Sequence, residues 1–377
     1  MINSLVIENF KCFENLRVSF GALTLLTGFN AGGKSSTVQP LLLLAQAYRG
    51  SIAAKQLMLN GPLVRLGTVG DILPANTSHS RIAFSVADTL EEVTWTASAS
   101  AGDRHLEVAE LRSRHLNNST SDIYVDGRAA SSCAIFQSLI KLSYLSAVRE
   151  GTGDAFPMPE EFNQGVVDVG IDGRFAPYWY DKFADDEVPT VRRHPNQPAS
   201  SLRKQLDAWF ATLFPGGRAN VQHIPQASLE SLQFRLTDIG AWQRPANVGY
   251  GFTYAFPILV ALLTANEGQL ILIDSPEAHL HPLAQSQMGR LLAHFAAAGV
   301  QIIVETHSDH LLNGARLAVK DGLLSYGALV VNFFSGASDT GHGVRSLAVD
   351  RDGRIDSWPD GFFDQSEKDL ARLSGWE

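Results

Sequence analysis

The feature that most constrains this chain is a glycine-rich loop that fits G-x-x-x-x-G-K-[ST], namely Gly28-Phe29-Asn30-Ala31-Gly32-Gly33-Lys34-Ser35. The loop follows an apolar run over residues 23–27 with the character of a strand, and it precedes a leucine-rich run over residues 34–48 with helical spacing. Glycines let backbone N–H groups turn toward a phosphate, and a helix N-terminus adds partial positive charge. A chance glycine turn is the alternative, but the strand and helix on either side favour a phosphate-binding loop.

The loop assigns roles to its residues. The Lys34 ammonium is expected to reach the β- and γ-phosphates of ATP, and the Ser35 hydroxyl is expected to ligate Mg²⁺. Farther along, residues 270–273 form an apolar run that ends in Asp274, where a P-loop ATPase places the carboxylate that holds Mg²⁺ through water. ATP and Mg²⁺ are therefore the predicted ligands. The predicted ATP-binding residues of the loop are Gly28, Asn30, Gly32, Gly33, Lys34, Ser35 and Ser36.

Composition excludes several other classes of protein. With 45% hydrophobic and 18% charged residues the chain is too apolar to be disordered, and its two cysteines cannot build a disulfide framework. A net charge of −9 argues against a bulk electrostatic affinity for nucleic acid, although a local basic face stays open. The longest nearly apolar run, residues 252–265, is shorter than the roughly 20 residues of a membrane span. Glu8 and Lys11 interrupt the N-terminus where a secretory signal is apolar, so we expect a cytoplasmic protein.

Periodicity divides the chain into segments. Residues 82–128 alternate as antiparallel strands do, and residues 202–213 have the spacing of an amphipathic helix. Between residues 270 and 304, two buried strands flank a helix, which predicts a parallel sheet. The predicted organisation is an N-terminal part of an ATPase head (1–81), a β-rich and helical middle insertion (82–230), a C-terminal part of the head (231–345) and a tail subdomain (346–377).

Three stretches resemble one family of ATPases. They are the opening IENFKCFENLRVSF with its glycine loop, the run EAHLHPLAQ after Asp274, and Val304-Glu305-Thr306-His307-Ser308. Together they resemble the RecF/SMC/OLD-like branch of ATP-binding-cassette (AAA family) ATPases, in a compact bacterial group without a Toprim domain. The resemblance covers about the first 65 residues and residues 231–377. It implies an α/β fold, a P-loop cassette-type head with a mixed sheet, flanking helices and a middle insertion. The middle segment has no sustained heptads, so a long coiled-coil arm is not expected.

The resemblance also implies roles for single residues. His307 takes the place of the switch histidine that hydrogen-bonds the γ-phosphate. Gly249 and Gly251 stand where cassette ATPases carry a helix-capping motif that faces the nucleotide of a second subunit, although the LSGGQ wording is absent and an ordinary helix cap is the alternative. His281 takes the place of the D-loop aspartate, which contacts a neighbouring subunit. An ATP-linked homo-oligomer is the predicted assembly.

One position departs from the family pattern. Cassette ATPases carry a glutamate that polarises the attacking water, whereas this chain has Ser275, whose hydroxyl is a weak base at pH 7. Hydrolysis is therefore expected to be slow or absent. Glu277 can substitute only if the turn after Pro276 folds its side chain back. The predicted catalytic residues are Lys34, Asp274, Glu277 and His307.

Several charged residues allow two interpretations. Asp350 and Asp352 suggest a Toprim-type metal site, but the sequence Asp350-Arg351-Asp352-Gly353 is typical of a tight turn, and too few residues follow for a Toprim domain. His279 and His281 suggest zinc, but Pro282 favours a new helix, and no cysteine or further histidine stands at ligand spacing. A solvated charged face is the favoured interpretation over phosphate or partner contacts for Arg149, Arg192, Arg193 and His194.

The function implied by the resemblance is ATP-controlled assembly of a bacterial anti-phage defence complex, in which a separate effector, a nuclease in the simplest case, supplies the cutting chemistry. A RecF-like DNA-repair ATPase that binds DNA is one alternative. A scaffold that binds ATP without turnover is another. Measurements of phosphate release and of salt-dependent DNA binding would distinguish these three functions.

Overall fold

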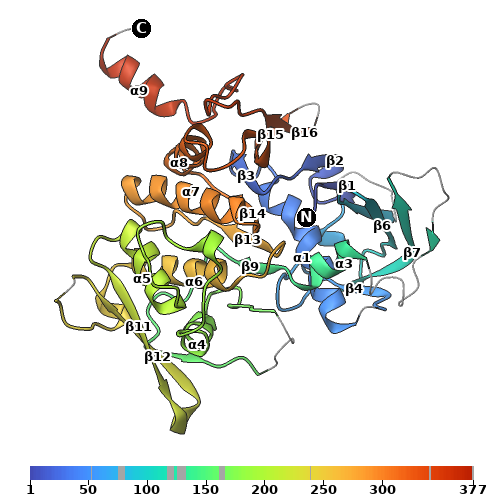
Figure 1. Cartoon of the computed structure of the whole chain (residues 1–377). Coiled ribbons are helices and arrows are strands. Elements are labelled where there is room, and N and C mark those ends of the chain that lie inside the picture. The colour runs from blue at the N-terminus through green and yellow to red at the C-terminus, as the bar shows by residue number, and fades with distance from the viewer. Residues whose placement is uncertain are drawn as a thin grey trace. The chain divides into compact units, whose positions relative to one another are not determined.

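The structure is a computed structural model, and it groups the chain into two compact units (Figure 1). Unit 1 comprises residues 1–140, 307–309 and 326–377, and unit 2 comprises residues 141–306 and 310–325. The segment boundaries predicted at residues 81, 230 and 345 stay predictions. The residues that the structure describes are 1–51, 53–74, 81–116, 123–124, 133–160, 166–237, 239–338 and 341–375.

Unit 1 contains an antiparallel sheet in the order β2-β1-β5-β6-β7-β4, with β8 beside β7. β1 connects β2 to the strands after residue 80, because Ile7 of β1 pairs with Leu16 of β2 on one side and with Phe84 of β5 on the other. The predicted antiparallel strands after residue 82 are confirmed, and they extend the sheet that the N-terminus begins. The strands are β1 (Ser4–Phe10), β2 (Phe13–Ser19), β4 (Gln56–Met58), β5 (Arg81–Ala87), β6 (Glu91–Ser98), β7 (His105–His115) and β8 (Ile123–Tyr124).

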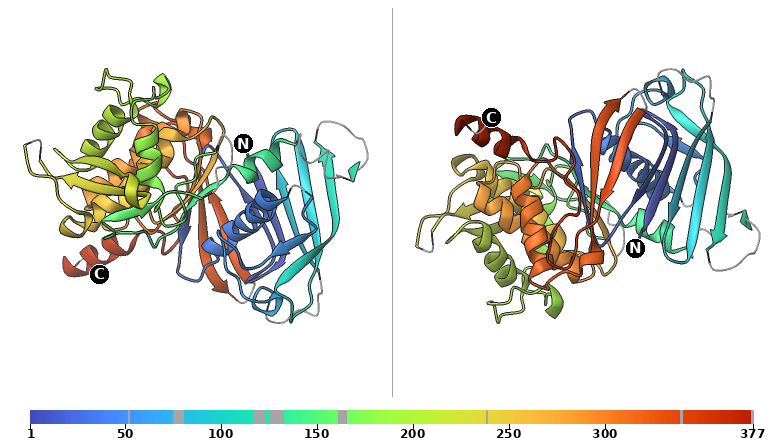
Figure 2. Two further views of the ribbon diagram at one scale, coloured as in Figure 1. Left: turned by 90° about the horizontal axis from the view of Figure 1, so that it is seen from below. Right: turned by 90° about the horizontal axis from the view of Figure 1, so that it is seen from above.

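The glycine loop of unit 1 connects a parallel strand to a long helix. β3 (Leu23–Gly28) pairs in parallel with β15 (Leu329–Ser338), and β16 (Gly341–Leu347) pairs antiparallel with β15. After the loop, α1 (Lys34–Gly50) packs against α3 (Ala134–Ile140) and the antiparallel sheet, as Figure 2 shows. A buried aromatic cluster fixes this packing: Trp95 Nε1 of β6 donates to the Tyr48 hydroxyl at 2.7 Å, and the Tyr48 and Phe136 rings lie 4.8 Å apart. The C-terminal helix of unit 1 is α9 (Gln365–Leu373).

Unit 2 contains three parallel strands, with β13 (Leu270–Asp274) between β9 (Ser143–Leu145) and β14 (Gln301–Glu305). Leu272 is opposite Tyr144 on one side and Ile303 on the other. α7 (Pro282–Ala297) connects β13 to β14, so the predicted strand, helix and parallel strand are confirmed, as is the amphipathic helix at α5 (Leu202–Leu213). A second, antiparallel sheet has the order β10-β12-β11. The remaining elements are α4 (Ala176–Lys182), α6 (Tyr250–Thr264), α8 (Asp309–Lys320), β10 (Ala155–Pro157), β11 (Arg218–Ile224) and β12 (Leu229–Arg235).

Helix length and composition also bear on membrane insertion. Within the described ranges, no helix combines the length and the apolar character that crossing a membrane requires.

Candidate functional site

The glycine loop of unit 1 has backbone angles that require glycine at two positions. Gly28 has a φ of 122°, and a Cβ there would lie 2.2 Å from the carbonyl oxygen of Phe334. Gly33 has a φ of 103°, and a Cβ there would lie 2.3 Å from Cζ of Phe13. Both angles belong to the region that L side chains avoid, and both positions lack the space for one. The glycines found in the sequence are therefore demanded by the shape of the loop.

Lys34 lies inside this loop. Its side chain is buried, with 4% of its surface exposed, and Nζ donates to the carbonyl oxygens of Phe29 at 2.8 Å and Gly28 at 3.2 Å. A buried ammonium has to be satisfied by hydrogen bonds, because removing it from water is costly. The loop carbonyls thus hold the positive charge at the centre of the loop, while Asn30 and Ser35 are exposed.

The first turn of α1 provides a second source of positive potential. Gly33 is its N-cap and gives no side-chain cap hydrogen bond, and the first turn contains no acidic residue. The partial positive charge of the helix N-terminus is therefore not offset by an acidic side chain of that turn. Together with Lys34, this is the kind of arrangement that suits an anion such as phosphate.

Three residues that the sequence did not identify form the wall of the loop. Phe13 and Phe334 leave no space for side chains at Gly33 and Gly28, respectively. The thiol of Cys12 interacts with the Ser36 side chain, and burial raises the pKa of Cys12 although hydrogen bonds and the Lys11 charge oppose the shift. From the sequence alone, Cys12, Phe13 and Phe334 would be interpreted as ordinary core residues. Only their contacts in the structure show that they form the wall of the glycine loop.

In unit 2, β13 ends at Asp274 in a tightly held turn. Ser275 has a φ of 49°, its hydroxyl donates to Oδ1 of Asp274 at 2.8 Å, and its N–H donates to the carbonyl oxygen of Glu305 at 2.8 Å. The Ser275 hydroxyl thereby orients the Asp274 carboxylate. Glu277 follows in the same turn, which is closed by the hydrogen bond from Leu280 N–H to the Glu277 carbonyl oxygen at 3.0 Å.

Arg149 is buried against this turn, so its assignment to a solvated face is wrong. Only 4% of its surface is exposed, and its guanidinium donates to the carbonyl oxygens of Asp274 and Ser275. Burial lowers the pKa of Arg149 to about 10, against the charges of Asp274 and Glu277, which raise it. The guanidinium is therefore still charged at pH 7. The parallel pairing of β9 with β13 brings it here, and sequence spacing contains no sign of that pairing.

The predicted subunit-contact residues gather at the start of α6 and α7 in unit 2. Gly249 is the N-cap of α6, and a Cβ there would meet no atom within 4 Å. A Cβ at Gly251, in contrast, would lie 2.9 Å from the carbonyl oxygen of His279. His281 is the N-cap of α7, where its Nδ1 accepts from Leu283 N–H at 3.4 Å, so the predicted new helix after it is confirmed. Gly249, His279 and His281 are exposed.

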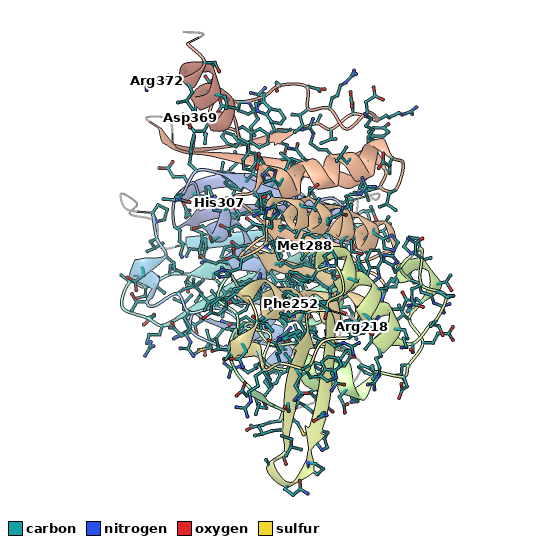
Figure 3. All side chains as sticks on the ribbon, turned by 90° about the vertical axis from the view of Figure 1, so that its left-hand side faces the viewer. Arg218, Phe252, Met288, His307, Asp369 and Arg372 are labelled. Carbon is teal, nitrogen blue, oxygen red and sulfur yellow. The ribbon has the colours of Figure 1, made fainter. Side chains whose placement is uncertain are left out.

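Two further predicted positions lie in or near the C-terminal part of the chain. His307, labelled in Figure 3, is exposed and follows two residues after Glu305, the register partner of Asp274.

Asp350 lies in the predicted tight turn, which is confirmed: its carbonyl oxygen accepts from Gly353 N–H at 3.0 Å, and its Oδ1 accepts from Arg354 N–H at 2.7 Å.

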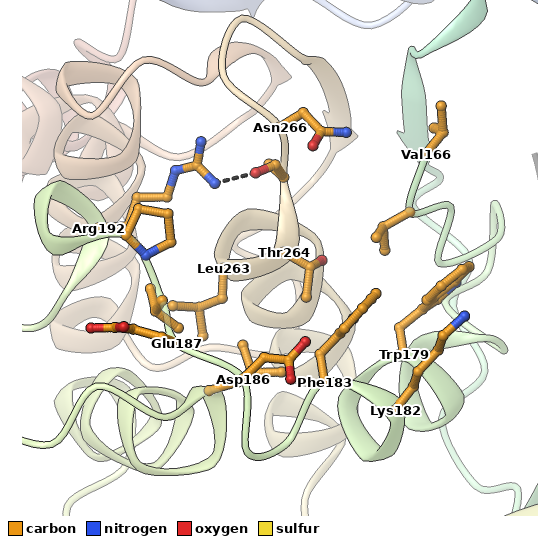
Figure 4. A pocket seen from close by; sticks show the side chains of 15 residues that line it. Val166, Trp179, Lys182, Phe183, Asp186, Glu187, Arg192, Leu263, Thr264 and Asn266 are labelled. Carbon is orange, nitrogen blue, oxygen red and sulfur yellow. Dashed lines mark hydrogen bonds between the residues drawn. The ribbon is translucent and has the colours of Figure 1, made fainter. Parts of the chain in front are cut away.

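Arg192 is the second arginine for which the solvated-face interpretation is wrong. It is 4% exposed, and its guanidinium donates to the carbonyl oxygen of Ala265. It lines a cavity of about 620 Å³ at the C-terminal end of α6 (Figure 4), with the apolar side chains of Trp179, Phe183 and Leu263. The carbonyl partner Ala265 lies 73 residues farther along the chain, at the end of α6, which is why a local charge pattern misread Arg192.

Two segments of the chain match known protein families. Residues 181–313 match a family described as "AAA domain, putative AbiEii toxin, Type IV TA system", and residues 327–373 match a family described as a protein of unknown function (DUF3696). Among curated proteins, none matches this chain.

Solved structures show the same fold at low identity. A Pyrococcus furiosus Smc head domain, crystallised with an extended coiled coil and the C-terminal domain of ScpA, has a TM-score of 0.55 and 11% identity, with 99% of each chain covered. An Smc head bound to the C-winged helix domain of ScpA has a TM-score of 0.54 and 13% identity, with 93% of this chain and 98% of that chain covered. The predicted α/β fold, a cassette-type ATPase head, is confirmed.

A P-loop after a parallel strand, a matched AAA domain and the fold of an Smc head occur together here. The chain therefore has the fold of an Smc head and contains a segment that matches an AAA-domain family, which is consistent with its resemblance to the SMC/RecF/OLD-like branch of ATP-binding-cassette-type ATPases.

Proposed function

We propose that this protein binds ATP with Mg²⁺ at its glycine loop and uses ATP binding, with slow hydrolysis, to assemble a bacterial anti-phage defence complex. The observation that carries the proposal is the loop of unit 1, in which Gly28 and Gly33 have no room for a Cβ and the buried Lys34 ammonium donates to the carbonyl oxygens of Gly28 and Phe29. A Cβ at Gly28 would collide with the Phe334 backbone and one at Gly33 with the Phe13 ring, so glycine is needed for the loop path that can turn backbone N–H groups toward a phosphate chain.

The roles of the site residues follow the motif. Backbone N–H groups from Gly28 to Ser36 hold the phosphates, and Lys34 neutralises the β- and γ-phosphate charge. Ser35 and Asp274 supply the hydroxyl and carboxylate oxygens that Mg²⁺ prefers, and His307 is assigned to the γ-phosphate. When bound, Mg²⁺ neutralises charge that develops on the transferred phosphoryl group.

Assembly is proposed to occur through the face of unit 2 that carries the exposed Gly249 and His281, with the buried Gly251 packed against the His279 backbone behind it. Two large apolar side chains are exposed beside these residues: Tyr250 at 49% and Leu283 at 67%. Exposed apolar surface of this kind is common where a second protein docks. We assign a second copy of this chain to the face, with ATP between the copies.

Gly249→Asp tests this assembly. The site is open and Gly249 has an extended backbone, so aspartate fits and is itself a favourable N-cap. Its carboxylate would face the γ-phosphate of the second copy, and like charges at an interface are costly. We expect ATP-dependent association to weaken by about 100-fold or more in analytical ultracentrifugation. Gly249→Asn, which adds the same volume without charge, should associate as the wild type does. The same oligomer with and without ATP in all three proteins would contradict the proposal.

The defence role draws support from the description of the matched family, a putative AbiEii toxin of a type IV toxin–antitoxin system. The Smc heads of similar fold bind a separate protein, ScpA, which offers a precedent for an effector held by the head. We propose that the effector of this protein is a nuclease encoded separately.

Purified protein with Mg²⁺ is accordingly expected to cut neither DNA nor RNA. Asp350 Oδ1 accepts from Arg354 N–H within its turn, and Asp352 lies 3.7 Å from the Arg354 guanidinium, which supports a structural role for both carboxylates in the turn. Gel assays with plasmid, linear DNA and RNA check this. Mg²⁺-dependent cleavage that disappears in Asp350→Ala would overturn it and restore the Toprim interpretation.

A further inference from the structure

Arg149 holds the backbone of the turn that carries Asp274. Buried guanidinium groups usually pair with carboxylates, but this one donates to main-chain carbonyl oxygens, that of Asp274 and, at 3.4 Å from both terminal nitrogens, that of Ser275. Ser275 has a positive φ, a conformation that persists in an L-residue only when the surroundings impose it. Arg149 on one side and the Glu305 carbonyl on the other supply those constraints.

The other face of Arg149 lies against the aromatic ring of Tyr254 in α6. The guanidinium carbon is 5.5 Å from the ring centroid, within the range of a cation–π contact. Desolvated contacts of this type are stronger than exposed ones, and this guanidinium is almost fully buried. The contact with Tyr254 therefore helps to hold the Arg149 guanidinium against the Asp274 turn.

From Tyr254 the contacts continue to the exposed face. The His279 ring lies 4.8 Å from Tyr254 and 5.2 Å from Tyr250, whose side chain is half exposed beside Gly249. Gly151, two residues after Arg149, lies so close to Tyr250 that a Cβ would be 2.7 Å from its ring. One continuous set of contacts therefore joins the Asp274 turn to the surface next to Gly249 and His281.

We propose that Arg149 is a positioning residue for the Asp274 carboxylate. In this proposal, Tyr254 and His279 couple the position of that carboxylate to docking of a second copy on the exposed surface around Tyr250, Gly249 and His281. Arg149 acts through its contacts with the turn backbone. By thermodynamic linkage, docking that tightens the Tyr250 and His279 contacts tightens divalent-metal binding at Asp274, and metal binding favours docking equally. This inference rests on the proposed ATP- and Mg²⁺-dependent function.

The test compares two binding measurements on the full chain. ATP affinity is measured by calorimetry in EDTA, and Mn²⁺ affinity is measured by electron paramagnetic resonance at saturating ATP. We expect Arg149→Met to leave ATP affinity within about twofold and to weaken Mn²⁺ binding by about tenfold or more, as loss of charge-assisted hydrogen bonds predicts. Arg244→Met is the matched control, because the Arg244 side chain is 72% exposed and forms an ion pair with the half-exposed Asp154.

A second pair of variants protects the test against misfolding of Arg149→Met. Tyr254→Phe keeps the ring and should behave as wild type, whereas Tyr254→Leu removes it and should weaken both Mn²⁺ binding and ATP-driven association by about three- to thirtyfold. Unchanged Mn²⁺ affinity in Tyr254→Leu, or equal loss in Tyr254→Phe and Tyr254→Leu, would overturn the inference while leaving ATP binding intact. Failure of the wild type to bind ATP would overturn the proposed function and this inference with it.

Discussion

Replacing Lys34 with alanine is expected to abolish measurable ATP binding. The ammonium is the one charged side chain of the loop motif, and without it the β- and γ-phosphate charge meets only backbone dipoles. Hydrogen bonds to charged groups contribute about 1.5–3 kcal/mol each, so losing two of them weakens binding by about 10²–10⁴-fold. Isothermal titration calorimetry measures this loss directly.

The variant needs a control for the structure of the loop, because Lys34 also donates to the carbonyl oxygens of Gly28 and Phe29. Its thermal melting curve reports whether unit 1 still folds. Lys55→Ala, which removes an exposed lysine of the same unit, should bind ATP as the wild type does. Undiminished ATP affinity in Lys34→Ala would refute the phosphate-loop assignment and with it the proposed function.

Wild-type phosphate release is expected to be slow, below about one turnover per second, whereas about ten per second is typical of enzymes. Ser275 stands where a catalytic glutamate is expected, and its hydroxyl proton is donated to Asp274. Ser275→Glu introduces a carboxylate at that position and should raise turnover, since a general base contributes about 10²–10⁴-fold. Ser275→Gln is the matched control, because it has similar length without the basic group. A phosphate-release assay at saturating ATP compares the three proteins.

Glu277 is the competing candidate for the base, and Glu277→Gln decides its role. Its negative charge opposes the lowering of the Arg149 pKa by burial, which gives Glu277 an electrostatic role at the turn. We therefore expect Glu277→Gln to change turnover little while ATP stays bound. Loss of turnover by about 10²-fold or more would identify Glu277 as the base instead. Wild-type turnover of tens per second that survives Glu277→Gln would contradict both assignments.

The sequence predicted those parts of the fold that local patterns encode. The apolar run before Gly28 and the helical leucine spacing after Lys34 gave β3 and α1, and the buried runs ending at Asp274 and Glu305 gave two parallel strands joined by α7. Each of these elements is specified by residues within about one element length, through strand or helix periodicity and glycine placement. The same local information identified the phosphate loop.

Contacts between distant segments could not be predicted in this way. The sequence shows Arg149 and Arg192 as charges in polar stretches, yet both are buried, because parallel pairing of β9 with β13 and packing around α6 cover them. Likewise, Phe13 and Phe334 become the walls of the glycine loop only when β3 pairs with β15 and the β1–β2 turn folds over α1.

The sequence by itself identified the phosphate loop, because a motif of adjacent residues dictates backbone conformation and hydrogen-bond donors without help from the rest of the chain. The cassette-type α/β head followed from the resemblance of three separate stretches to a known family. Only the tertiary structure decided what surrounds Asp274. There a guanidinium 125 residues away holds the turn, and an aromatic contact ties it to an exposed face. Burial of a charge depends on which strands pair and which helices cover them, and that is a property of the whole fold.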